Sequence, residues 1–224
     1  WLPRARPDAR KPALISFDVR PEGFRAIPGN HLQLISGGIA IFLEAGLPQG
    51  ARLLSSIAPC SFAGFVSSVV AWLLSGGSLA LHHPADLQVL ESQIVDEHHD
   101  TLIAPAPLAL RLAESGTLAR PHVSIRHVVG LWRTPDRVAA SNDWQDTGTT
   151  LTDVYLFGEI GLFGARRGDD GAPAPIRPGP FSAPRGAASS KTIGDIIVTP
   201  KGTLALRGAM VPVAAYRIPS DDPL

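Results

Sequence analysis

The sequence has 224 residues, of which 45% are hydrophobic, and its 20 Lys and Arg residues balance its 20 Asp and Glu residues. A chain of this length and composition buries a sizeable core, as one large domain or two small ones. Because the net charge is zero and basic residues do not cluster with aromatic ones, we expect neither nucleic acid nor an anionic membrane as a partner.

The longest apolar stretch, residues 62–74, includes Gly64, Ser67 and Ser68 and is too short to cross a bilayer. We therefore expect a buried helix there and no membrane span. Cys60 is the only cysteine, which excludes an internal disulfide, and no charged-then-apolar leader opens the sequence. These features predict a soluble protein of the reducing cytoplasm, in which Cys60 is a packing residue without the setting of a nucleophile.

Short β-rich runs alternate with helical patterns over most of the chain. Strands are expected at 13–17, 52–57, 78–81, 101–104, 125–132 and 151–157, and helices at 31–45, 62–74, 86–98, 107–114 and 135–144. Asp86 caps one helix, and Gly116 follows the end of another. This alternation is typical of crossover units that build a mostly parallel sheet with helices on both faces, so the fold class is α/β.

The pattern changes near residue 165. Residues 166–186 carry five prolines and four glycines and are expected to form a loop or linker. Two strand-like runs follow at 193–199 and 203–207, with a hairpin-like turn between them.

The predicted organisation is therefore an α/β core over residues 1–164 and a small antiparallel β subdomain over 165–224. Residues 218–224, at the end of the second part, have the composition of a linker.

The run over residues 153–161 is the most informative candidate site. It places Tyr155 and Glu159 four residues apart, where a buried strand turns into a loop. Gly158 and Gly161 permit a tight exit that leaves Glu159 at the rim of the sheet, and open α/β sheets bind ligands at such a rim. A plain strand end with a solvated glutamate explains the same residues.

Over nearly its whole length the chain resembles the adenylate-forming superfamily, which includes acyl- and aryl-CoA synthetases, luciferases and nonribosomal adenylation domains. Residues 155–159 are similar to the family's Tyr-Gly-x-Thr-Glu motif. The resemblance implies that Tyr155 packs on the nucleotide and that Glu159 holds Mg²⁺ on the phosphates. Gly158 stands where the family has a phosphate-binding threonine, so nucleotide affinity is expected to be about tenfold or more lower. Residues 202–211 resemble a second family motif, a strand that contains Arg-Gly.

The resemblance places the family's phosphate loop at residues 17–25. Arg25 falls six residues before His31, which matches the interval between the loop lysine and the following helix start. Asp18 and Glu22 stand where the family has hydroxyls and glycines, and they would repel a triphosphate. This is a degraded phosphate loop in which Arg25 supplies positive charge at the lysine position, or is simply an exposed loop arginine.

Residues 57–64 resemble a loose form of the family's Pro-x-x-His-x-x-Gly segment, which borders the acyl-binding pocket. The resemblance assigns Phe62 and Gly64 to the substrate pocket. A phenylalanine that begins a buried helix is also an ordinary core residue, and this alternative stays open.

Residues 128–135 occupy the place of the family's glycine-rich turn that contacts adenine. Gly130 and Trp132 would then lie at the cofactor. The bulky Trp132 and its neighbour Arg133 replace small residues and would narrow or block an adenine slot.

The resemblance implies an ATP-dependent ligase that activates a small acyl or aryl carboxylic acid as an acyl-adenylate. Its cofactors would be ATP or AMP and Mg²⁺, with CoA or a carrier protein as the acceptor. The sequence stops before the family's ribose-binding aspartate and its C-terminal domain, so we expect part of a longer enzyme. The alternative is a degenerate relative that binds an acyl or aryl ligand, or a protein partner, without adenylation. A purely structural α/β domain is a third hypothesis.

Two histidine pairs, at 82–83 and 98–99, invite a metal hypothesis. Adjacent side chains point in different directions, so each pair offers one ligand at most, and no second cluster has metal-ligand spacing. We expect no zinc site.

Overall fold

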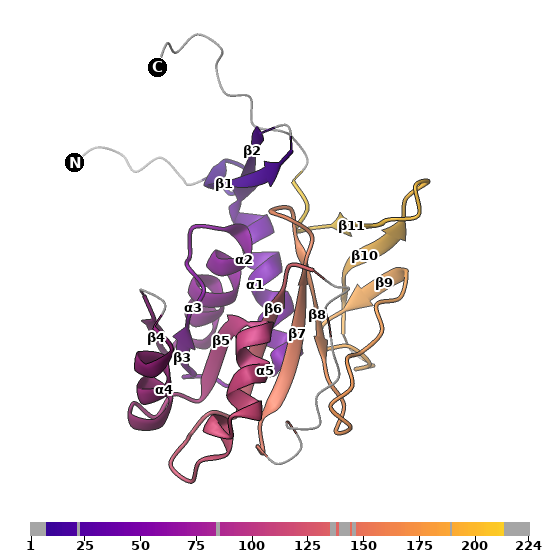
Figure 1. The fold of residues 1–224 in the computed structure, drawn as a ribbon. Coiled ribbons are helices and arrows are strands. Elements are labelled where there is room, and N and C mark those ends of the chain that lie inside the picture. Colours follow the sequence, from indigo (N-terminus) through magenta and orange to yellow (C-terminus); the bar gives the residue numbers. More distant parts are fainter. Residues whose placement is uncertain are drawn as a thin grey trace, which may run out of the picture.

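The computed structural model describes residues 8–212, without residues 22, 84–85, 135–137, 139–143, 145–146 and 189. The described part contains three sheets, with two, six and three strands (Figure 1). The six-stranded sheet is the centre of the α/β core, and the three-stranded sheet lies beside its last strand.

A β-hairpin begins the described chain. Its strands, β1 (Pro12–Arg20) and β2 (Gly23–Asn30), pair antiparallel, with Asp18 opposite Arg25. The prediction of a loop from residue 17 to 25 was therefore wrong. Apolar residues occupy every second position of β1, at Ile15, Phe17 and Val19. This period of two continues the strand through the segment that was expected to be a loop.

The large sheet has the order β4-β3-β5-β6-β7-β8. Its strands are β3 (Arg52–Ser55), β4 (Ser78–Leu81), β5 (Thr101–Pro105), β6 (His127–Trp132), β7 (Thr150–Leu156) and β8 (Leu162–Arg166). Every neighbouring pair is parallel except β7 and β8. The mostly parallel sheet is thus confirmed. The antiparallel β8 was not predicted, and the expected boundary at residue 164 falls inside it.

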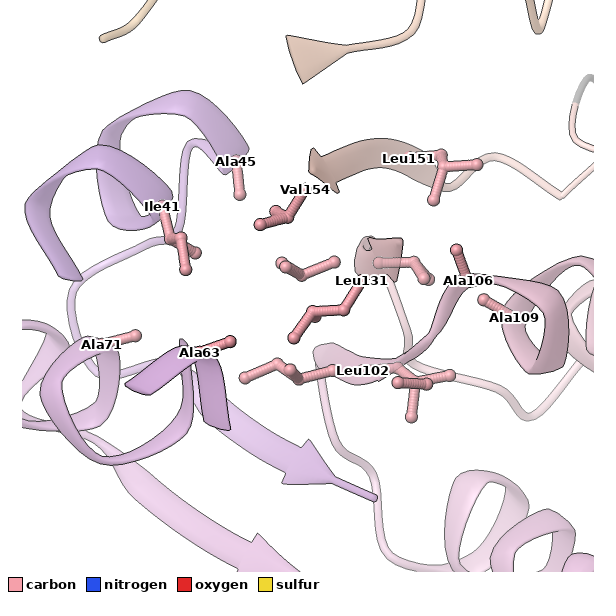
Figure 2. Close-up of a cluster of buried hydrophobic side chains, with 14 of the residues drawn as sticks. Ile41, Ala45, Ala63, Ala71, Leu102, Ala106, Ala109, Leu131, Leu151 and Val154 are labelled. Carbon is pink, nitrogen blue, oxygen red and sulfur yellow. The ribbon is translucent and has the colours of Figure 1, made fainter. Parts of the chain in front are cut away.

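Helices cover both faces of this sheet (Figure 1). They are α1 (His31–Ala45), α2 (Phe62–Gly64), the π-helical η1 (Phe65–Val70), α3 (Ala71–Ser75), α4 (Leu87–Asp96), α5 (Ala106–Glu114) and the 3₁₀ turn η2 (Thr117–Ala119). Figure 2 shows Ile41 and Ala71 on one side of the core and Ala106 and Ala109 on the other, with Leu131 between them. The helix predicted over 135–144 lies outside the described residues, apart from positions 138 and 144.

Helix α1 begins and ends with strong local signals. Asn30 and Gln33 form a capping box, in which the Gln33 backbone N donates to Asn30 Oδ1 at 3.0 Å and the Asn30 backbone N donates to Gln33 Oε1 at 2.8 Å. Gly46 ends the helix in the left-handed conformation, with φ 63°. Gln33 Nε2 also donates to the carbonyl of Val211 at 3.0 Å, which ties the last described residues to the start of α1.

Helices α2, η1 and α3 form one continuous helical segment from residue 62 to 75. A Cβ at Gly64 would lie only 2.1 Å from the carbonyl oxygen of Ala58, and a Cβ at Gly38 of α1 would lie 2.3 Å from Val70. Glycine at these two positions lets the segment pack tightly against both the loop after β3 and α1.

The small antiparallel sheet has the order β11-β10-β9. Its strands are β9 (Gly179–Ser182), β10 (Thr192–Val198) and β11 (Leu204–Gly208). The predicted antiparallel part is confirmed, but β9 lies inside the stretch that was expected to be a loop. Met210 is fully buried against Gly161, where a Cβ would meet its Cγ at 3.3 Å, so this sheet packs on the start of β8.

A buried ion pair joins β7 to the chain that leaves β8. Arg167 Nε lies 2.8 Å from Asp153 Oδ2, and its Nη2 lies 3.1 Å from Oδ1. Trp132 Nε1 donates to the same Oδ1 at 2.7 Å. The side chains of Arg167 and Asp153 are 1% and 0% exposed. Three N–H groups therefore compensate the desolvation of one carboxylate.

An aromatic cluster lies beside this pair. The Tyr155 ring stacks on Phe163 at 6.1 Å, and Phe163 meets Phe181 edge-on at 5.1 Å. Tyr155 is only 2% exposed. Burial, with a smaller contribution from the Asp153 carboxylate, raises the pKa of Tyr155 to about 12.

Replacing Asp153 with Asn should lower the free energy of unfolding by about 3–5 kcal/mol, because it leaves the Arg167 guanidinium buried without its counter-ion. Asp195→Asn in the exposed pair with Arg207 is the matched control and should cost less than about 1 kcal/mol. Denaturant unfolding measures both. Equal losses in the two variants would contradict a special role for the buried pair.

The Tyr155 hydroxyl should also make stability depend on pH in the alkaline range. Its folded-state pKa is raised above the unfolded value of 10.0 to about 12, so the stabilisation is complete below pH 10 and declines as pH rises towards 12. The loss should reach roughly 2–3 kcal/mol. Tyr155→Phe cannot ionise there, so its denaturant midpoint should fall less between pH 9 and 12. If the denaturant midpoints of the two proteins fell equally between pH 9 and 12, ionisation of Tyr155 would not be the cause of the alkaline loss of stability.

Candidate functional site

The strand order defines one place where a ligand cleft is expected. From β3 the chain moves outward to β4 and then returns to β5 on the other side of β3. With right-handed crossovers, the connections after β3 and after β5 lead to helices on opposite faces of the sheet. Open α/β sheets bind ligands in the crevice at such a switch point, outside the carboxyl ends of the strands.

Two adjoining cavities occupy this position, and we call them together the switch-point cleft. Their volumes are about 400 and 550 Å³. The two share the lining residues Cys60, Ser61, Ala63, Arg133 and Leu156. The smaller one is completed by residues from the ends of β3, β5 and β6: Ser56, Ile57, Ala58, Pro105 and Leu131. The larger one is completed by the hairpin and the turn after β7: Phe17, Asp18, Val19, Gly158 and Glu159.

Glu159 reaches across the cleft to the start of the helical segment at residue 62. Its Oε2 accepts a hydrogen bond from the backbone N of Phe62 at 2.6 Å. Ser61 Oγ accepts from the backbone N of Gly64 at 3.0 Å, so the helix start has two side-chain caps. Among the described residues, the second oxygen of Glu159 accepts no hydrogen bond. The carboxylate is thus a helix cap with one oxygen available.

Gly158 is held in the left-handed conformation beside the hairpin. Its φ is 57°, and a Cβ there would lie 3.2 Å from Asp18 Oδ1. A threonine at this position would be strained and would crowd the Asp18 carboxylate. Glycine in place of the motif's threonine therefore goes together with a left-handed backbone conformation at residue 158. The larger cavity holds two carboxylates, Asp18 and Glu159, and one guanidinium, Arg133.

The predicted nucleotide-contacting residues other than Gly158 do not line this cleft. Tyr155 stacks on Phe163 in the core, and Trp132 turns to Asp153. Gly130 faces α5, where a Cβ would lie 3.0 Å from the Cβ of Ala106. Trp132 therefore neither narrows nor lines the cleft. The nucleotide roles of Tyr155, Gly130 and Trp132 stay predictions.

The two predicted substrate-pocket residues, Phe62 and Gly64, are packed in the interior and do not line the cleft. Phe62 is 3% exposed and lies against Gly37 of α1, where a Cβ would meet its Cζ at 3.1 Å. Gly64 packs against the Ala58 carbonyl, as described above. Arg25 is exposed on β2. Of the predicted site residues, the structure brings only Gly158 and Glu159 into the cleft.

Two cleft residues were missed as site candidates. Cys60 was expected to be a packing residue, but it is exposed and lines both cavities. The signal was Ser61 as an N-cap just before an apolar run, which places Cys60 at a helix entrance after a parallel strand. Arg133 follows the last residue of β6, the position from which parallel strands present side chains to ligands.

One histidine of each pair makes a local side-chain contact. His82 Nδ1 lies 2.7 Å from Gln93 Oε1, and His99 Nε2 lies 3.0 Å from Glu97 Oε2. Within the described ranges, no group of three or more His, Cys, Asp or Glu side chains is placed to hold a metal ion. No helix in the same ranges has the length and apolar character needed to span a membrane.

No protein-family profile matches the sequence, and neither does any curated protein. Solved structures do match. Apo MatB from Rhodopseudomonas palustris aligns with 96% of this chain and 43% of its own length, at 16% identity and a TM-score of 0.67. A malonyl-CoA ligase product complex with methylmalonyl-CoA and AMP aligns with 97% of this chain and 48% of its own, at 16% identity and a TM-score of 0.66.

O-succinylbenzoate CoA synthetase from Bacillus subtilis, in complex with ATP and a magnesium ion, covers 92% of this chain and 43% of its own length. Its identity is 12% and its TM-score 0.65. The chain spans less than half the length of these structures. Over nearly its whole length, the chain therefore has the fold of part of an adenylate-forming acid–CoA ligase, as its motifs predicted.

Proposed function

We propose that this chain forms the acid- and nucleotide-binding part of an ATP-dependent acid ligase, and that the reaction takes place in the switch-point cleft. The observation that carries the proposal is the position of Glu159, which lies at the rim of that cleft in a fold shared with ATP- and AMP-bound ligases. The carboxylate oxygen of the acid would attack the α-phosphorus of ATP, break the bond to the bridging oxygen and release pyrophosphate. Such catalysis depends on positioning and on charge stabilisation.

The cleft residues suit these tasks in different ways. The second carboxylate oxygen of Glu159 fits Mg²⁺, which needs few protein ligands when phosphates supply the others. Arg133 supplies the one positive charge among the described lining residues and would balance a carboxylate or phosphate. Ile57, Pro105 and Leu131 form an apolar wall for an acyl or aryl group. Arg25 as a phosphate ligand, and CoA as the acceptor, rest on the family resemblance alone.

A second function is favoured by the hairpin. The region that would cradle a triphosphate is β-paired, and it places Asp18 against Gly158. Two carboxylates beside the expected phosphate position oppose nucleotide binding unless a cation intervenes. We therefore keep a degenerate relative, which binds an acyl or aryl acid without adenylating it, as the alternative. For either function, the single cysteine supports a reducing cytoplasm as the compartment.

The ligase hypothesis predicts acid-dependent exchange of labelled pyrophosphate into ATP by the intact gene product, tested with short aliphatic acids, dicarboxylic acids and aromatic acids. Glu159→Gln keeps an oxygen that accepts the Phe62 hydrogen bond but removes the charge. Its exchange rate should fall at least about tenfold while its stability changes little, because a charged contact worth about 1.5–3 kcal/mol is weakened.

Glu159→Ala is the paired variant, since it removes both the charge and the cap. It should lose exchange to a similar degree and also about 1 kcal/mol of stability. Absence of exchange with every acid in the unmodified protein would reject the ligase hypothesis. An exchange rate in Glu159→Gln equal to that of the unmodified protein would contradict the proposed role of Glu159 as a metal ligand.

The alternative function makes its own prediction through Cys60, the only thiol in this chain. An acid that occupies the cleft should slow modification of Cys60 by a maleimide reagent, because this side chain lines both cavities. Protection by acids without ATP, together with no pyrophosphate exchange, would select the binding function. If no acid in the panel protects the thiol, neither function operates in this cleft. Arg133→Gln should reduce protection about tenfold if its guanidinium holds the carboxylate.

A further inference from the structure

A second hollow, of about 460 Å³, lies between β8 and β9 and shares no lining residue with the switch-point cleft. Both strands are on the side of the molecule where the small sheet meets the large one (Figure 1). Its walls include Phe163, Pro175, Arg177, Pro180, Phe181 and Arg185. We call it the β8–β9 hollow. The lining thus combines two guanidinium groups with two aromatic rings.

Arg185 is held in place by a buried carboxylate from α1. The Arg185 backbone N donates to Glu44 Oε2 at 2.7 Å, and its Nε donates to Oε1 at 3.3 Å. Glu44 is only 3% exposed, and its Oε1 also accepts from the backbone N of Arg166 at 3.0 Å. The fixed contacts of Arg185 are therefore made by its backbone and by Nε, on the side of Glu44.

The two Nη atoms of Arg185 form the outer end of the same guanidinium, away from the contacts with Glu44. Its central carbon lies 5.4 Å from the centre of the Phe163 ring, so the planar group sits over an aromatic face. Within the described ranges, the two Nη atoms of Arg185 make no hydrogen bond, and Arg177 makes no ion pair. Arg185 is thus pre-positioned with its two-pronged end unused, the geometry that matches a carboxylate or phosphate.

The charge and shape of the hollow narrow the ligand class. None of the nine lining residues that the structure describes is Asp or Glu, so Arg177 and Arg185 give the hollow a positive lining. Phe163 and Phe181 meet edge-on at 5.1 Å, and two proline rings, at 175 and 180, add rigid apolar walls. We propose that the β8–β9 hollow binds a planar aromatic anion, with its carboxylate or phosphate on the two arginines and its ring against the apolar walls. This site is independent of the function proposed for the cleft.

Titration of the ¹⁵N-labelled protein with benzoate and with phenyl phosphate tests this site by NMR. Saturable shifts are expected at the Arg177 and Arg185 Nε–Hε signals and at backbone amides of residues 174–186, with a dissociation constant on the order of 1 mM. The preferred probe of the two identifies the anion. Benzyl alcohol and acetate, which lack the charge or the ring, should bind at least about tenfold more weakly.

Arg177→Gln should weaken binding of the preferred probe about tenfold, because one charge-assisted contact is lost. Arg120→Gln, which removes an exposed arginine at the end of η2, is the matched control and should bind as the unmodified protein does. Arg185→Lys keeps the charge but loses the planar fork, and should also bind more weakly.

Cys60 modification separates this hollow from the switch-point cleft. Arg177→Gln should weaken the shifts at residues 174–186 but leave any protection of Cys60 by the same acid unchanged, because Arg177 does not line the cleft. Unsaturable shifts, equal binding by Arg177→Gln, or equal affinity for benzoate and benzyl alcohol would overturn the proposal. Shifts confined to the cleft would do the same.

Discussion

The buried pair of Asp153 and Arg167 is the interaction on which the arrangement of the C-terminal half depends. A carboxylate without exposure is stable only with full compensation, and three N–H groups from two side chains supply it. This requirement fixes the chain immediately after β8, commits Trp132 to the interior, and holds β7 and β8 in register. Tyr155 lies two residues beyond Asp153 on the same face of β7, so it too faces the core. Tyr155 and Trp132, to which the resemblance assigns nucleotide contacts, thus both pack in the core.

The turn that follows β7 connects the two sides of the cleft through the hydrogen bond from Phe62 to Glu159. Glu159 caps the helix that begins at Phe62, and Gly64 permits the close approach that brings this helix end to the sheet. A carboxylate at a helix N-terminus is favourable whether or not a ligand is bound, because it satisfies an unpaired N–H and interacts with the helix dipole. The same residue therefore serves the fold and, in the proposed function, the metal.

Sequence periodicity predicted the parallel strands and most of the helices because these segments are long and have clear ends, as the capping box of α1 illustrates. It missed β2, β8 and β9, each of which contains glycine or proline, and it ended β1 too early. Glu159 was found through a motif. Cys60, Arg133 and Asp18 were not assembled into one cleft, because they follow or belong to different strands and only the strand order brings them together. Since both faces of a parallel sheet are buried, alternation along β6 and β7 did not reveal that Trp132 and Tyr155 face the core.

The charges of the two hollows imply different modes of ligand binding. In the switch-point cleft, the described lining carries Asp18 and Glu159 beside Arg133, so in the proposed function a triphosphate would bind together with Mg²⁺. In the β8–β9 hollow, Glu44 is buried behind Arg185 and the described lining carries no acid, so the proposed anion would need no metal. The hairpin at the expected phosphate position therefore does not by itself exclude the proposed nucleotide chemistry: it would make that chemistry depend more strongly on the cation that Glu159 would hold.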